Sequence, residues 1–171
     1  MKTESAINPL LLQLIESLRH ELHQYGEMLA LLEHQQESVM ARAADAVLNS
    51  VVSINEQMGR IQSARQQRSS CQSEVARHLR QPEDPTFATL VPMLPEKFRV
   101  PVESLVRENN QLLTRVQQRA RQNHLLLSRS LAMMQQLMNS LVPATPPTTY
   151  NGEGTLKTAD KPVQVLYEAV G

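Results

Sequence analysis

The stretch that decides the fold is residues 8–40, NPLLLQLIESLRHELHQYGEMLALLEHQQESVM. Its apolar side chains recur at alternating spacings of four and three residues, which is typical of a long helix that packs along one seam. Asn8 and Pro9 predict the start of this helix, because Asn accepts hydrogen bonds from free backbone N–H groups and Pro has no N–H to leave unpaired. We expect a helix over about 9–41. Its seam residues are Leu11, Ile15, Leu18, Leu22, Tyr25, Leu29, Leu32 and Val39.

The composition extends this helical prediction to the whole chain. Among 171 residues there is no Trp, two Phe and three Tyr, while Leu, Met, Ala, Gln, Glu and Arg dominate, as in long helices rather than sheets. This length suits a single domain. We therefore predict an all-α fold.

A second helix is predicted over about 46–80. Its heptad seam is apolar at first, becomes polar, and then ends on two apolar residues. The stretch Ala43-Ala44-Asp45 holds neither Pro nor Gly, so the chain either turns sharply there or continues as a kinked helix; we favour a tight turn capped by Asp45. The seam residues are Val47, Val51, Ile54, Met58 and Ile61, then Arg65, Arg68 and Gln72, then Val75 and Leu79.

Residues 81–100 contain four prolines, which no long helix tolerates. Asp84-Pro85 is expected to cap one short helical turn that carries Phe87 and Leu90. A third long helix is predicted over 101–141, PVESLVRENNQLLTRVQQRARQNHLLLSRSLAMMQQLMNSL. The predicted architecture is a long antiparallel hairpin plus this third helix, a three-helix coiled-coil-like bundle over 1–142. Residues 143–171, rich in Pro, Thr and Gly, are predicted to be a mobile tail.

Charge constrains the partners. The formal net charge is +0, but residues 1–43 carry six acids and three bases, whereas 101–142 carry two acids and five arginines. This asymmetry favours packing of the first helix against the third. No aromatic side chains interleave with the arginines, which argues against nucleic-acid binding. The N-terminal apolar run is too short for a membrane span and lacks a cleavage site, so we expect neither membrane insertion nor a signal peptide.

The residues that could support catalysis or metal binding do not form a recognisable site. His20 and His23 lie near Glu16, but the Glu-to-His spacing is four rather than the three of di-metal bundles, and a solvated helix face is the simpler interpretation. His20 could also accept a phosphoryl group, but no Lys lies nearby to stabilise that group, so a role in phosphotransfer is not favoured. Cys71 is the single cysteine and has only Arg68 as a basic neighbour within one turn, which favours an inert thiol in a reducing compartment. We predict no enzyme activity, no cofactor and no metal.

The third predicted helix changes character along one strip of its surface. The strip is charged at Glu108, Arg115 and Arg119 and then apolar at Leu126, Met133 and Leu137. One interpretation is that another part of this chain covers the apolar half, either the Phe87–Leu90 turn or the tail residues Val163, Val165 and Leu166. The other is a docking surface for a partner helix, to which flexible Met side chains adapt.

Three stretches resemble the flagellar type III export chaperones that serve hook-associated junction proteins, the FlgN-like family. They are LALLEHQQESVMARAADAVL around the predicted turn, ENNQLLTRVQQRARQNHLLL in the third helix, and TTYNGEGTL just beyond it. The resemblance covers about 10–156, and the order of Asn pair, later Asn and Tyr-x-x-x-Gly makes it specific. The tail is longer than in the family, Asn151-Gly152 departs from the usual order after the Tyr, and 157–171 have no counterpart.

The resemblance implies a cytoplasmic chaperone without cofactor. Such a protein binds the terminal helices of hook-associated junction proteins, prevents their premature assembly and delivers them to the export gate, whose cytosolic domain would bind Tyr150. Asn109 and Asn123 have a second interpretation as residues that fix helix register. The remaining alternative is a structural coiled-coil scaffold or a self-assembling helical protein, and a homo-oligomer of the unloaded chain stays open. The implied client-binding residues are Asn109, Leu113, Asn123, Leu126, Leu127, Met133, Met134, Leu137, Met138 and Leu141.

Overall fold

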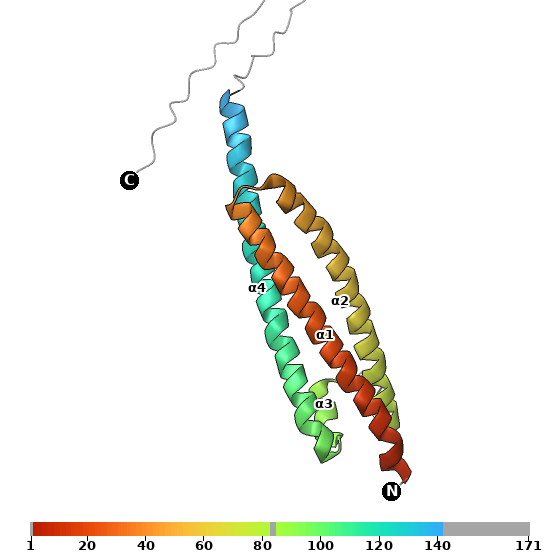
Figure 1. Ribbon diagram of the computed structural model, residues 1–171. Helices are drawn as coiled ribbons and strands as arrows, with labels where there is room; N and C mark the ends of the chain where they lie inside the picture. The colour runs from red at the N-terminus through yellow and green to blue at the C-terminus, as the bar shows by residue number, and fades with distance from the viewer. Residues whose placement is uncertain (1, 83–84, 142–171) are drawn as a thin grey trace, which may run out of the picture. The chain divides into compact units, whose positions relative to one another are not determined.

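The computed structural model describes residues 2–82 and 85–141, with side chains from Ile7 onward. Over these residues the chain is helical, which confirms the all-α prediction and the long hairpin followed by a further long helix (Figure 1). The predicted tail, 143–171, lies outside the described residues. The helices are α1 (Lys2–Met40), α2 (Ala44–His78), α3 (Phe87–Leu90), the 3-10 turn η1 (Val91–Met93) and α4 (Glu96–Leu141).

Two helices begin earlier than predicted, so the expected starts at Pro9 and Pro101 were wrong. Both prolines lie inside their helices, where each lacks the N–H that would donate to the carbonyl four residues earlier. In α4 the extra turn buries Phe98 one turn before Val102. Burial of an aromatic side chain compensates for the missing hydrogen bond.

The turn between α1 and α2 is tight, as favoured, but it lies at 41–43 rather than at Asp45. Arg42 adopts φ 56°, and the Ala43 N–H donates to Ser38 O at 3.0 Å while the Arg42 N–H donates to Val39 O at 3.1 Å. This is the Schellman pattern of helix termination, here with Arg at the position that Gly usually takes. Asp45 makes no cap. It lies in the first turn of α2, where a carboxylate stabilises the helix by interacting with the positive end of the helix dipole.

α1 and α2 run antiparallel and side by side (Figure 1), but α2 buries only part of the seam that was predicted. Gln72 and Val75 are buried, and Ile54, Ile61 and Leu79 pack against buried apolar side chains. Val51 and Met58 are exposed, whereas Ser50, Gln57 and Ala64, at intervals of seven, are buried. The Gln57 amide donates to Gln24 O at 2.9 Å and to Gln24 Oε1 at 2.8 Å. Small and amide side chains at these positions allow the two helices to approach closely. The hydrogen bonds of Gln57 add to the apolar contacts that Ile54 and Ile61 make with a buried cluster around Tyr25.

α1 and α4 run parallel in one register. Asn109 Nδ2 donates to Leu18 O at 3.0 Å and Asn123 Nδ2 donates to Leu32 O at 2.7 Å, and both pairs are 91 residues apart in sequence. Arg119 lies 3.6 Å from the Glu33 carboxylate. The structure thus confirms the packing of the acidic first helix against the basic third one.

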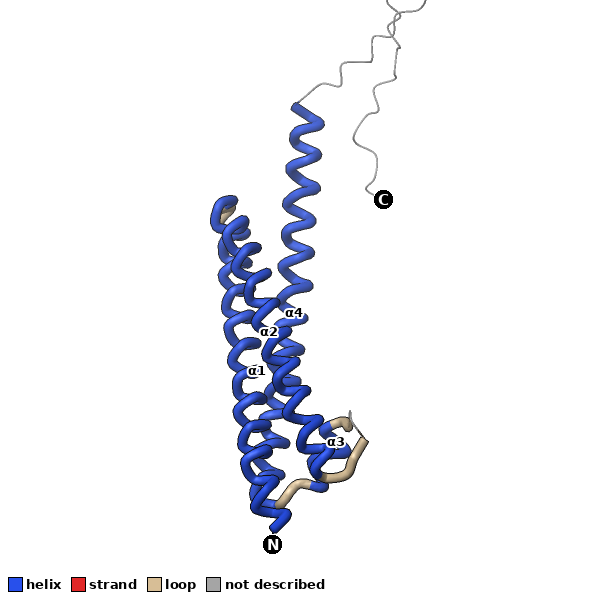
Figure 2. The backbone as a smooth tube through the Cα atoms, turned by 90° about the vertical axis from the view of Figure 1, so that its right-hand side faces the viewer, coloured by secondary structure: helices blue, strands red, loops and turns tan. Residues whose placement is uncertain are grey.

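Apolar side chains gather in two clusters. The first joins α1, the end of α2, α3 and the start of α4, and it contains Leu11, Leu14, Leu90 and Val102. The second joins Tyr25, Met28, Leu29 and Leu32 of α1 to Val116 of α4. Figure 2 shows α3 and its flanking loops at the end of the bundle where the first cluster lies.

The short helix α3 is therefore part of the core. Leu90 is fully buried in the first cluster and Phe87 packs against it. Its N-cap is Thr86, whose Oγ1 accepts from the Thr89 N–H at 3.3 Å; Asp84 lies outside the described residues. The apolar side chains of α3, Leu90 and Phe87, thus contribute to the first cluster, which is formed by residues of α1, α2, α3 and α4 before Ser128.

Candidate functional site

The last described turns of α4, residues 129–141, are the candidate site, and we call them the α4 end. The chain up to Ser128 forms one compact unit, and Arg129 begins a second. Every residue of the α4 end is exposed. Its six large apolar side chains have 58% to 78% of their surface exposed. They are Leu131, Met133, Met134, Leu137, Met138 and Leu141.

The local sequence explains why this segment is helical without any core of its own. Residues 129–141 read RSLAMMQQLMNSL, with no Gly, no Pro and no β-branched residue, and Leu, Met, Ala and Gln are all good helix formers. From Ser130 to Leu141 there is no charged side chain. A contiguous exposed surface of large apolar residues marks an interaction site in a soluble protein, so the α4 end is suited to bind apolar surface of a partner.

The sequence-predicted residues fall into three environments. Met133, Met134, Leu137, Met138 and Leu141 are exposed on the α4 end. Leu126, Leu127 and Leu113 are half-buried, and Leu113 packs against the second apolar cluster. Asn109 and Asn123 are buried and, as α4 residues bonded to α1, are inaccessible to a partner while these helices stay together. Tyr150 lies outside the described residues.

The two asparagines bind α1 through their amide nitrogens alone. Besides its bond to Leu18, Asn109 Nδ2 donates to Leu105 O at 2.9 Å, and Asn123 Nδ2 donates to Gln35 Oε1 at 3.0 Å as well as to Leu32. Their Oδ1 atoms are buried without a hydrogen-bond partner. A buried Asn in a helical seam fixes register at a cost in stability, and the equal offset of these two pairs is what such a role requires.

Replacing both Asn109 and Asn123 with Leu is expected to raise the free energy of unfolding by about 1–3 kcal/mol, because two buried unpaired oxygens disappear. Urea unfolding measures the change. Asn110→Leu, at the exposed neighbouring position, is the control and should change stability little. A double variant that is less stable than the wild type would show that the hydrogen bonds to α1 outweigh the unpaired oxygens.

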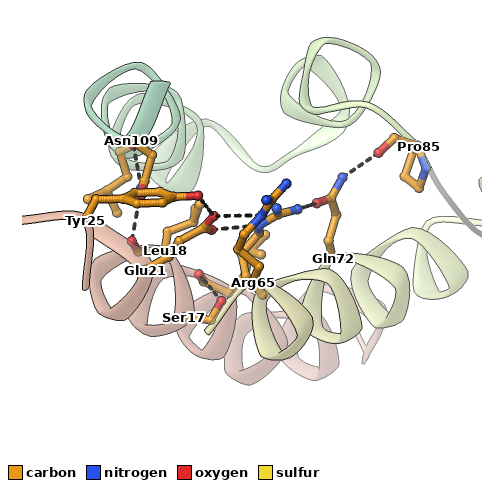
Figure 3. A network of polar contacts seen from close by, with 11 residues as sticks. Ser17, Leu18, Glu21, Tyr25, Arg65, Gln72, Pro85 and Asn109 are labelled. Atoms are coloured by element: carbon orange, nitrogen blue, oxygen red, sulfur yellow. Dashed lines mark hydrogen bonds and ion pairs between the residues drawn. The ribbon is translucent and has the colours of Figure 1, made fainter. Parts of the chain in front are cut away.

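A polar network connects α1, α2 and the segment before α3 (Figure 3). We call it the polar layer. The Glu21 carboxylate is buried and accepts from the Tyr25 hydroxyl at 2.8 Å and from Arg68 Nε at 2.9 Å, with Arg65 Nε at 4.0 Å. Arg68 also donates to Gln72 Oε1 at 2.8 Å, and Gln72 donates to the Pro85 carbonyl. The layer thereby ties the segment before α3 to the hairpin. The sequence analysis did not identify Glu21 and Gln57 as buried polar residues. The signal for such residues was the polar part of the predicted α2 seam, Arg65, Arg68 and Gln72.

Burial, together with the hydrogen bond to Glu21, raises the pKa of Tyr25 from its ordinary value of 10.0 to about 12. The unfolded chain therefore ionises this phenol at lower pH than the folded one. The stability linked to Tyr25 is complete below pH 10 and is lost as the pH rises through 12.

The free energy of unfolding is accordingly expected to fall more steeply between pH 10 and 12 in the wild type than in Tyr25→Phe, which has no phenol to ionise. Urea unfolding of both proteins, repeated at a series of pH values from about 9 upward, measures the difference. Parallel curves for the two proteins would contradict the proposed environment of Tyr25.

Two further findings concern the described residues. Within 2–82 and 85–141, no three His, Cys, Asp or Glu side chains come together as metal ligands would. Over the same part of the chain, no helix combines the length and hydropathy that crossing a membrane requires.

Comparison with known proteins gives one family. The family model described as FlgN protein matches residues 10–158, which is most of the chain and includes every predicted site residue. No curated protein and no solved structure matches the chain.

Proposed function

Because the chain belongs to the FlgN protein family of flagellar export chaperones, we propose that it is a cytoplasmic chaperone that binds the terminal helices of hook-associated junction proteins. In this role it prevents their premature assembly and delivers them to the export gate. The observation that carries the proposal is the α4 end, a helical surface without charged side chains from Ser130 to Leu141, on which six large apolar side chains are exposed.

The chemistry of this surface suits the terminal helices of such clients. An amphipathic helix binds by laying its apolar face against another apolar helical surface, with contacts at intervals of three and four residues. Met side chains are unbranched and flexible, so Met133, Met134 and Met138 adapt to apolar faces of different shape. Each large side chain covered contributes about 1.5–3 kcal/mol. Covering the client's apolar face in this way is what keeps it from assembling early.

The other predicted residues take supporting roles in this proposal. Leu126 and Leu127, half-buried just before the α4 end, extend the client surface toward the bundle. Leu113, Asn109 and Asn123 act through the packing of α4 on α1, where the asparagines hold one register.

The rival function is a scaffold or self-assembling coiled coil that covers the α4 end permanently with copies of itself. Light scattering coupled to size-exclusion chromatography separates the two, applied to the chain alone and after co-expression with a hook-associated protein. The chaperone proposal predicts a stable complex with the client. A large self-oligomer that forms no complex with any hook-associated protein would refute it.

Tyr150 is proposed to bind the cytosolic domain of the export gate, apart from the client surface. Tyr150→Ala is therefore expected to retain client and to bind the gate domain at least tenfold more weakly. Titration of the isolated gate domain with the client-loaded chaperone measures this, with Tyr167→Ala as the matched control. Loss of client binding in Tyr150→Ala would contradict the division of roles.

A further inference from the structure

Eight of the exposed side chains of the α4 end lie in two adjacent stripes along the helix. The first comprises Ser130, Met133, Leu137 and Ser140, and the second Leu131, Met134, Met138 and Leu141. Both follow the spacing three, four, three of a coiled-coil seam, and the second is shifted by one residue. At 3.6 residues per turn the two stripes therefore lie about 100° apart around the helix.

One partner helix cannot cover both stripes. A helix in a coiled coil contacts its neighbour along a single seam of alternating spacings of three and four. From Met133 to Leu131 the large apolar side chains span about 160° of the helix surface, and each of the six is more than half exposed. A single bound helix would leave two to four of them in water.

The first stripe is suited to burial despite its two serines. The Ser140 hydroxyl donates to Leu137 O within the helix at 2.7 Å, so burying it leaves no unpaired donor. Serines at both ends of the stripe also allow a second backbone to approach Met133 and Leu137 closely. With no charged residue between Ser130 and Leu141, the complementary partner surface is uncharged along both stripes.

We propose that the α4 end binds two helical segments of its client at once, one on each stripe, so that the three helices together form a small coiled-coil bundle. This inference rests on the proposed function and specifies its partner as a client that presents two helical segments. The terminal helices of a hook-associated protein, one from each end of the chain, are the segments that the proposal assigns to the stripes.

The test uses two matched double variants of the full chain, Met133→Gln with Leu137→Gln on the first stripe and Met134→Gln with Met138→Gln on the second. Gln preserves helix propensity, and circular dichroism verifies that both variants melt as the wild type does. Calorimetric titration then measures binding of an intact hook-associated protein and of versions that lack its N-terminal or its C-terminal helical segment.

Each double variant is expected to bind the intact client at least tenfold more weakly. With one segment deleted, one double variant should bind as the wild type does while the other remains weakened, and deletion of the other segment should reverse this pattern. A client that binds equally well without one segment would overturn the inference, as would two variants that respond identically to both deletions. Failure of the intact client to bind wild-type chain would instead refute the proposed function itself.

Discussion

The variant Met133→Gln, Met134→Gln, Leu141→Gln is expected to bind hook-associated client about a thousandfold more weakly than the wild type and to melt at the same temperature. These side chains are 66%, 65% and 78% exposed in the free chain, so their replacement removes no internal packing. If the client covers each of them, the loss is about 1.5 kcal/mol per residue, and every 1.4 kcal/mol is a factor of ten in affinity.

A matched control exists on α2. Leu48, Val52 and Met58 are 66%, 59% and 58% exposed, and their replacement with Gln removes three exposed apolar side chains from a different helix. Affinity for the client should stay within about threefold of the wild type, as for surface changes away from an interface. Equal losses for the two triple variants would mean that binding follows general surface hydrophobicity rather than the α4 end.

The second large effect concerns the core. Leu14→Ala is expected to lower the free energy of unfolding by about 2–5 kcal/mol, because a fully buried Leu loses its contacts and leaves a cavity. Leu14 has 0% of its surface exposed and packs in the cluster that joins α1, α2, α3 and α4.

Leu12→Ala is the internal control, since Leu12 lies on the same helix and is 56% exposed. It should change the free energy of unfolding by no more than about 0.5 kcal/mol. Urea unfolding of both variants measures the contrast. Equal destabilisation would contradict the assignment of the core face of α1.

The number and order of the long helices could be predicted from the spacing of apolar residues along the chain. In α1 this heptad spacing also identifies the buried face of the helix. The turn could be placed only approximately. Arg42 takes the left-handed conformation at the end of α1, and without a Gly there the sequence gives no local signal for that conformation. The early starts of α1 and α4 likewise depend on tertiary contacts, those of Phe98 in α4 above all.

The face of α2 was only partly predicted for a related reason. Apolar periodicity favoured Val51 and Met58, which are exposed, and missed Ser50, Gln57 and Ala64, which are buried. Amide pairs such as Gln57 with Gln24 stabilise an interface only when two helices meet in one register, and periodicity within one helix carries no information about that register. The burial of Glu21 could not be predicted for the same reason, since its two arginine partners lie 47 and 44 residues away.

The exposed apolar side chains of the α4 end could be predicted in part from the sequence, whereas their role as a site stays a prediction. The change of one strip of α4 from charged to apolar identified Met133 and Leu137 before the structure showed that both are exposed. Exposure itself requires knowledge of the whole fold, which is why Leu126, on the same strip, is half-buried. For Asn109 and Asn123 the sequence left two roles open, client binding and fixing of helix register. The structure shows hydrogen bonds from both side chains to α1, which support the register role.

The central claim is that a client binds the α4 end, and site-specific photo-cross-linking tests it most directly. A photoreactive phenylalanine analogue at position 134, replacing Met134, is compared with the same analogue at position 48, replacing Leu48; both native side chains are about equally exposed, at 65% and 66%. With a hook-associated protein bound, position 134 should cross-link to the client and position 48 should not. Cross-linking from position 48 alone, or from position 134 only to a second copy of this chain, would contradict the claim.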